Sequence, residues 1–248
     1  MADLYLSAKQ KLAGASALIE DLEREIAAFN ATEPHERLVE TDPEGLVQEH
    51  RVRLVRPLPD HLADLTAETT EALRTALDYA VFAASRAAGS LRPVDTCFPI
   101  AADRKALDKV MAEKCEGVPK DIAQTILALK PYRGANDLIW GLAAIGNTEK
   151  FALIVPLGSV DSGLTFINNK TAPRVRWDAK HREIELGFFP IHGRFNRDIN
   201  IFFSAAFGEV DGLEGRPVVP TLKEMAEEVE RILGVMEEAS SRLDQTAE

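Results

Sequence analysis

The stretch FALIVPLGSVDSGLTFINNKTAPRVRWDAKHREIELGFFP, residues 151–190, decides the fold class. Short apolar or alternating runs are separated there by Gly, Asn, Asp and Pro, which is typical of strands joined by turns. The join at Asp178–His181 is too short for a parallel crossover, so it predicts a hairpin within an antiparallel meander. The predicted strands are Phe151–Leu157, Gly163–Asn168, Arg174–Trp177, Glu183–Phe189 and Ile199–Phe207.

Helical periodicity marks the sequence on both sides of this region. Helices are predicted up to about Asn30, over Thr66–Ala88, over about 103–115 and 119–129, from an N-cap at Asn136, and over Thr221–Arg242. The predicted fold is therefore a single α+β domain over residues 1–248, with the N-terminal and central helices packed on the meander. Its helical part covers about 1–150, its sheet about 151–208, and its closing amphipathic helix about 221–242.

The closing helix has the clearest pattern in the chain. Thr221 and Glu224 have the spacing of a capping box, and an apolar stripe that includes Val229 and Ile232 follows. Its other face is acidic, whereas helices that lie on membranes are usually rich in Lys and Arg. We therefore expect the apolar face to pack against protein, either in this chain or in a homo-oligomer.

The segment between the first two predicted helices divides into a loop and a strand. Residues 31–45 carry two prolines, a glycine and several acids without an apolar period, so we expect an exposed loop that proteases cut first. Residues Leu46–Val55 alternate, with Arg51 and Arg53 on the face opposite Val52 and Leu54. This alternation predicts a strand.

Composition limits the partners and the compartment. The net charge is −11, which argues against binding to long nucleic acid, since that is driven by phosphate neutralisation. No apolar stretch approaches the length of a membrane span, and the first residues lack the pattern of a secretory signal, so we expect no membrane association and a cytoplasmic location. Cys97 and Cys115 are too few for a disulfide framework and are expected in the core.

The motifs of catalysis and cofactor binding are absent from the sequence. It has no phosphate-binding glycine loop, dinucleotide fingerprint, nucleophile elbow or zinc-ligand spacing, so no cofactor or metal is expected. Arg-x4-His occurs at Arg56–His61 and Arg176–His181, a spacing similar to that of HEPN-type ribonucleases. The first copy contains two prolines and the second spans the predicted hairpin, so we interpret both as chance.

Three short motifs carry a resemblance. They are the helix Leu73–Asp78, the turn Phe98-Pro99-Ile100, and a segment with Pro131-Tyr132-Arg133-Gly134, Leu138-Ile139-Trp140, Leu142 and Asn147-Thr148-Glu149-Lys150. Residues 66–157 thereby resemble a broad group of bacterial proteins without an established activity. That group continues the last motif with His-Arg, where this chain has Phe151-Ala152. The resemblance implies no reaction or cofactor.

Five residues form the candidate ligand site. Arg74 and Asp78 lie one helical turn apart and are expected to form an ion pair. Arg133, Asn147 and Lys150 are expected to line a cleft for an anionic ligand near the junction of the fourth helix and the sheet.

Two functional hypotheses remain open. The first is a non-catalytic binding or interaction protein. The alternative is an RNA-directed enzyme or toxin-like factor that uses the strand residues Arg51, Arg53, Arg174 and Arg176. A contiguous basic patch beside a polar cleft would favour the second hypothesis, and scattered arginines would favour the first.

Overall fold

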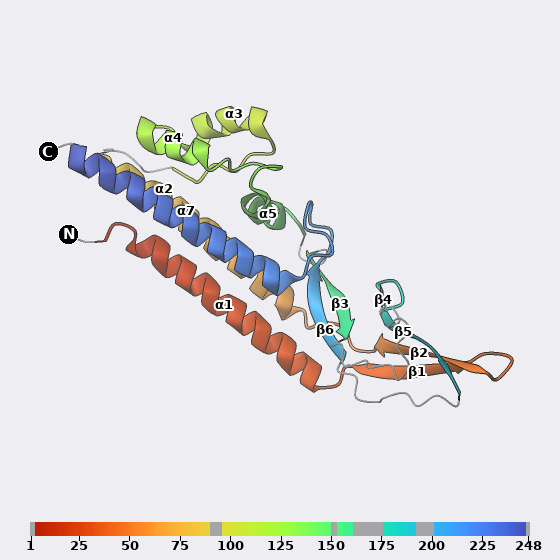
Figure 1. Ribbon diagram of the computed structural model, residues 1–248. Helices are drawn as coiled ribbons and strands as arrows, with labels where there is room; N and C mark the ends of the chain where they lie inside the picture. The colour runs from red at the N-terminus through yellow and green to blue at the C-terminus, as the bar shows by residue number, and fades with distance from the viewer. Residues whose placement is uncertain (1–2, 90–95, 150–152, 161–175, 192–200, 247–248) are drawn as a thin grey trace.

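The chain folds as an α+β structure, as the sequence predicts, with antiparallel sheets and a closing helix. The computed structural model describes residues 3–89, 96–149, 153–160, 176–191 and 201–246. Three long helices lie side by side, the strands gather at one end of them, and both termini lie at the opposite end (Figure 1). No helix in the described ranges has the length and apolar character needed to cross a membrane.

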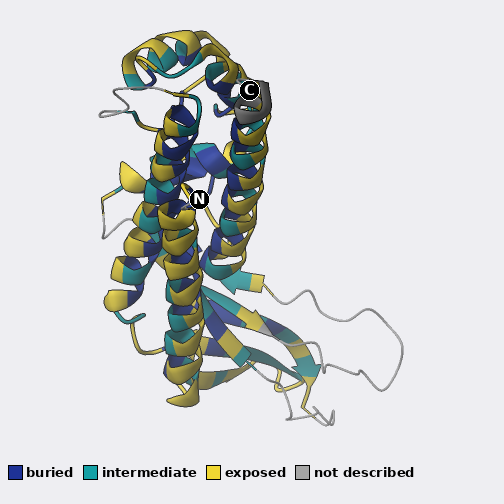
Figure 2. Cartoon of the chain, turned by 90° about the vertical axis from the view of Figure 1, so that its left-hand side faces the viewer, coloured by how far each residue is buried: buried dark blue, intermediate teal, exposed yellow. Residues whose placement is uncertain are grey.

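The long helices are α1 (Leu6–Ala31), α2 (His61–Ala87) and α7 (Val218–Thr246). The first runs toward the strands, and the other two run away from them (Figure 1). Each buries a stripe of apolar residues at three- and four-residue spacing, and its opposite face is exposed (Figure 2). The buried apolar residues of α7 are Val218, Leu222, Met225, Val229, Ile232, Leu233 and Met236. One chain therefore already covers the apolar face of α7.

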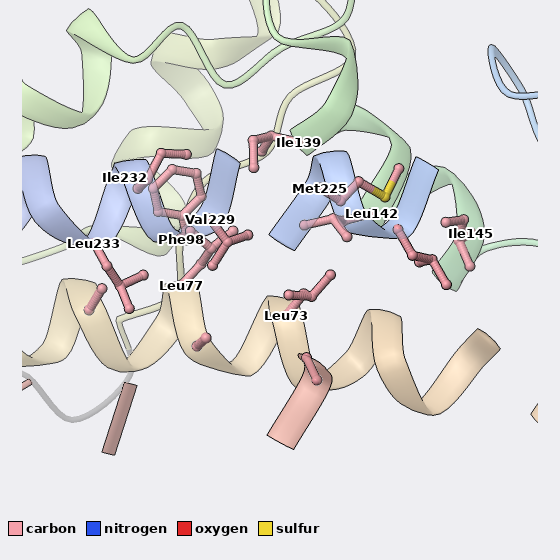
Figure 3. Packing of buried hydrophobic residues seen from close by; sticks show 14 of the residues in the cluster. Leu73, Leu77, Phe98, Ile139, Leu142, Ile145, Met225, Val229, Ile232 and Leu233 are labelled. Atoms are coloured by element: carbon pink, nitrogen blue, oxygen red, sulfur yellow. The ribbon is translucent and has the colours of Figure 1, made fainter. Parts of the chain in front are cut away.

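Three shorter helices lie along the bundle. They are α3 (Arg104–Lys114), α4 (Lys120–Ala128) and α5 (Asp137–Gly146). Ile139, Leu142 and Ile145 of α5 enter the core between α2 and α7 (Figure 3). Asn136 caps α5 as predicted, because its Oδ1 accepts from the Ile139 N–H at 3.3 Å, and its Nδ2 also donates to Glu228 Oε1 of α7 at 2.7 Å.

The strands form two antiparallel sheets rather than one meander. The first contains β1 (His35–Thr41), β2 (Val47–Leu54), β5 (Glu183–Pro190) and β4 (Arg176–Asp178), in that order. The second pairs β3 (Ile154–Val160) with β6 (Ile201–Phe207). The hairpin between β4 and β5 is confirmed, whereas the predicted strand at Gly163–Asn168 lies outside the described residues.

The predicted loop at 31–45 is wrong over its middle part, because β1 (His35–Thr41) lies there and forms a hairpin with β2, although most of these residues are exposed as predicted. This strand has little apolar pattern of its own, which is why periodicity misses it. Its stability comes from the ladder to β2 and from acids facing arginines across the ladder. Glu36 pairs with Arg53 at 3.5 Å, and Glu40 pairs with Arg51.

Two helices begin earlier than predicted. Helix α7 begins at Val218, so Thr221 is inside it and buried, and Glu224 pairs with Arg216 at 2.7 Å instead of closing a capping box. Pro220 is tolerated because the first turn needs no N–H donor. Helix α2 begins at His61, and the hydroxyl of Thr66 donates to the Leu62 carbonyl one turn back.

The two sheets pack closely on one another. A Cβ at Gly158 of β3 would lie 2.7 Å from Cε3 of Trp177 and from Cγ1 of Ile184, so only glycine fits there. The end of α1 joins this layer through Asn30, whose Oδ1 accepts from the Phe203 N–H at 2.8 Å and whose Nδ2 donates to the Phe203 carbonyl at 2.7 Å. The side chain of Asn30 thus completes the backbone pairing of β6.

Candidate functional site

A polar cleft of about 280 Å³ lies between α2 and α5. Residues 97–100 and Lys114 at the end of α3 close it. The lining residues are Arg74, Leu77, Asp78, Cys97, Phe98, Ile100, Lys114, Trp140, Ala143 and Asn147. The volume is slightly below the usual range of ligand pockets, about 300–1,000 Å³, so the cleft suits a small ligand.

Helix α2 contributes two charged residues to the cleft. Arg74 and Asp78 follow Leu73 and Leu77, which are fully buried and fix the rotation of the helix. The guanidinium of Arg74 lies over Gly146 at the end of α5, where a Cβ would come 2.6 Å from Nη1. The absence of a side chain at Gly146 therefore lets Arg74 reach across from one helix to the next.

The carboxylate of Asp78 anchors the wall of the cleft. Its Oδ1 accepts from the Phe98 N–H at 2.7 Å, and the Phe98 ring is buried in the core beneath (Figure 3). Burial raises the pKa of Asp78 above its ordinary value of 3.8, although the Phe98 hydrogen bond and the charges of Arg74 and Lys114 act in the opposite direction. The two cations are thus close enough to influence this carboxyl.

Lys114 is the last residue of α3 and brings a second cation to the cleft. The helix starts at an Asp103 cap, whose Oδ1 accepts from the N–H groups of Lys105 and Ala106. At its end the Lys114 carbonyl accepts from the Cys97 N–H at 3.1 Å, which ties α3 to the cleft wall. Across the described ranges, neither Arg74 nor Lys114 has an ion-pair partner within 4.0 Å.

Trp140 of α5 adds an N–H donor. The indole is half-buried and lines the cleft, and its Nε1 is shielded from solvent without an acceptor among the described residues. A buried donor without a partner costs about 1–3 kcal/mol, so such groups usually have a water molecule or a ligand.

The structure brings together three of the five residues that the sequence singles out. Arg74, Asp78 and Asn147 line one cleft. Arg133 does not, because its exposed guanidinium pairs with Asp211 at 2.7 Å elsewhere on the surface. Lys150 lies outside the described residues.

The expected ion pair between Arg74 and Asp78 is also wrong. In the part of the chain that the structure describes, their charged groups do not come within 4.0 Å of one another. Arg74 instead extends toward α5, and Asp78 is held by a backbone N–H. The Arg74 guanidinium therefore does not form an ion pair with Asp78, the acid one helical turn away.

Sequence reasoning misses Lys114 and Cys97 as parts of the site. Both flank segments of low periodicity, and only the tertiary structure brings them to α2. Cys97 is exposed at the cleft, contrary to its predicted core position, while Cys115 is buried as expected. Burial raises the pKa of the Cys115 thiol to about 12, so it stays protonated near neutral pH.

Two arginines of the first sheet, Arg51 and Arg53, are neutralised locally. Glu183 is buried between Arg51 and Arg53, with its Oε2 3.0 Å from Arg51 Nη1 and its Oε1 2.8 Å from Arg53 Nε. Arg176 is exposed on β4, and Arg174 is outside the described residues. Arg51 and Arg53 therefore do not supply the free basic patch that the RNA hypothesis requires.

No group of three His, Cys, Asp or Glu side chains within the described residues has the arrangement of a metal site. No family model, curated protein or solved structure matches the chain. The geometry of the cleft is consequently the basis for a functional assignment.

Proposed function

We propose that this chain is a binding protein whose cleft between α2 and α5 takes a small anionic ligand. The observation that carries the proposal is the pair of cations, Arg74 and Lys114, that line one cleft without an ion-pair partner among the described residues. Asp78 is the acid among the lining residues, and one of its oxygens is engaged by Phe98. The lining therefore has a net charge of +1.

The remaining lining groups complement an anion. Trp140 and Asn147 line the cleft and carry neutral N–H donors, while Leu77, Phe98 and Ile100 supply apolar walls. Hydrogen bonds from charged donors contribute about 1.5–3 kcal/mol each, more than neutral ones. A carboxylate, sulfate or phosphate group on a small ligand fits this combination of donors.

Isothermal titration calorimetry with sulfate, phosphate and succinate tests the proposal. We expect saturable one-to-one binding of at least one of these anions. Arg74→Gln and Lys114→Gln should each lower the affinity roughly tenfold to a hundredfold, since each removes one charge-assisted contact. Gly146→Ala should weaken binding more mildly, because its methyl group displaces only the flexible end of Arg74.

Arg133→Gln is the matched control. It removes the same charge from a residue that lies off the cleft, so the affinity should not change. Thermal unfolding of each variant verifies that it folds. Absence of binding by the wild-type protein to all three anions would contradict the proposal, and so would equal affinity of the wild type and Arg74→Gln.

A further inference from the structure

A second and larger concave surface runs along the other side of the bundle. It is a groove of about 740 Å³ between α1 and α7, and we call it the α1/α7 groove. Its apolar floor is formed by lining residues that are buried or half-buried, Leu12, Ile19, Ala226 and Leu233, and charged side chains that are mostly exposed form its rims. The two helices run side by side in opposite directions along it (Figures 1 and 2).

Ion pairs mark the two ends of this groove. At one end Lys9 Nζ lies 2.8 Å from Glu237 Oε1, and at the other Lys223 Nζ lies 2.7 Å from Glu23 Oε1. The distance from residue 9 to residue 23 along α1 corresponds to about 21 Å of helix. The groove is thus long, with an apolar floor and polar rims, and such a groove can receive an amphipathic helix.

The rims have an excess of negative charge. Besides the glutamates in the two ion pairs, Glu20, Glu227 and Glu230 line the groove, and none of the three has an ion-pair partner among the described residues. Both lysines of the lining are already paired. The net charge of the lining is −3, so an occupant with a basic polar face is favoured.

A second copy of the chain does not meet this requirement. The chain has a net charge of −11, and residues 209–248 alone carry eleven acidic against four basic side chains. Two copies that brought such surfaces together would repel one another. The charge of the groove therefore favours a different protein.

We propose that the α1/α7 groove binds an amphipathic helix with a basic polar face from a partner protein. The partner places an apolar stripe on the floor between α1 and α7, and its Lys or Arg side chains reach Glu20, Glu227 and Glu230. The docked helix adds a fourth long helix beside the existing three. This interaction is independent of the anion cleft, which lies between α2 and α5.

Two glycines provide a matched test. Gly234 lines the groove and Gly14 does not, yet both are exposed in the middle of long helices and have nothing within 4 Å of an added Cβ. Gln is a better helix former than Gly, so Gly234→Gln and Gly14→Gln should both fold. Only the first places a side chain in the groove.

The probe is a fluorescent helical peptide of about 18 residues, long enough to span the groove. Leucines occupy one face and lysines occupy the others, and a control peptide has the same leucines with glutamates. Fluorescence anisotropy should show saturable binding of the lysine peptide and none of the glutamate peptide. Gly234→Gln should weaken binding by roughly tenfold or more, and Gly14→Gln should leave it unchanged.

Charge is tested by combining Glu20→Gln, Glu227→Gln and Glu230→Gln. This variant should bind the lysine peptide roughly tenfold more weakly and with less dependence on salt. Equal binding of both peptides, or equal binding by Gly234→Gln and Gly14→Gln, would overturn the proposal. So would dimerisation of the wild type, measured by sedimentation, that Gly234→Gln abolishes, because a second copy would then occupy the groove.

Discussion

At the scale of single residues, the shape of the cleft depends on two side chains of α2, Asp78 and Arg74, which contact different segments of the chain. Asp78 binds the Phe98 N–H, and Arg74 crosses to Gly146 instead of closing on the acid one turn away. The sequence indicates that these residues belong to one helix face. It does not indicate the partner of each, because the partners come from segments about 20 and 70 residues away.

The titration of Asp78 gives a prediction about pH. Burial raises the pKa of this carboxyl above 3.8, so on acidification it takes up a proton earlier than an ordinary aspartate. Protonation removes the negative charge from the cleft, while sulfate keeps its own charge. The affinity for sulfate should therefore increase as the pH falls through the raised pKa of Asp78, as measured by calorimetry across a pH series.

Asp78→Asn is the control for this prediction. Its amide oxygen can still accept from the Phe98 N–H, but the side chain no longer titrates. The variant should bind sulfate more tightly than the wild type near neutral pH and should lose most of the pH dependence. An unchanged pH profile in Asp78→Asn would show that another group titrates.

At the scale of elements, hydrophobic period identifies the helices well and the strands less well. The apolar stripe of α7 follows from the sequence alone, and every member is at most 3% exposed. Strand β1 lacks such a stripe, since its pairing depends on β2 and on ion pairs across the ladder. The first residues of α7 and α2 also differ from the predicted ones, because Pro220 and Thr66 can lie within the first turns of a helix as well as at its start.

The core position of α7 predicts a large effect of buried charge. Val229→Asp and Ile232→Asp would each place a carboxylate at a site with no exposure. The cost is several kcal/mol against a typical total stability of about 5–15 kcal/mol, so both variants should unfold or melt far lower. Glu227→Asp introduces the same residue on the exposed face and should change the melting temperature little. Wild-type-like unfolding of both buried variants would mean that α7 is only loosely attached.

In the first sheet, Glu183 is a buried charged residue. Burial alone raises the pKa of this carboxyl, but the hydrogen bonds and charges of Arg53 and Arg51 outweigh burial, and the pKa lies below the ordinary 4.5. A depressed pKa means that the stabilisation is complete above the unfolded-state pKa and is lost as the pH falls through the folded-state pKa.

Glu183→Gln should therefore lower the free energy of unfolding by about 2 kcal/mol at neutral pH, because it leaves two arginines without their shared partner. Below the folded-state pKa the difference from the wild type should shrink. Glu185→Gln lies on the same strand without an ion pair among the described residues, so its effect should stay within about 0.5 kcal/mol. Chemical denaturation at several pH values measures both variants, and equal losses would contradict the special role of Glu183.

At the scale of the whole molecule, the fold class is predictable and the strand order is not. Turn residues and alternating runs mark strands after residue 151, but β5 joins the N-terminal hairpin while β3 pairs with β6. Contacts between such distant segments depend on close fits, such as Gly158 against Trp177 and Asn30 against Phe203. The local sequence pattern does not indicate these contacts, because the two residues of each pair are far apart in the chain.

The arrangement of the whole chain also separates two surfaces with opposite charge. The cleft between α2 and α5 has a net positive lining, and the α1/α7 groove on the other side of the bundle has a net negative one. A small anion and a basic helix would therefore bind at different places. The cleft is central to the proposed function, because Arg74 and Lys114 both line it and neither has an ion-pair partner among the described residues.

The most direct test is the response of the Trp140 indole N–H to sulfate in a nitrogen–proton correlation spectrum. The chain has two tryptophans, and Trp177 lies in the sheet beside Phe203, away from the cleft, so it serves as an internal reference. If an anion binds between Arg74, Lys114 and Trp140, the Trp140 resonance should shift progressively and saturate, while the Trp177 resonance stays in place. A Trp140 resonance that does not move, or that moves only in parallel with Trp177, would contradict the anion cleft.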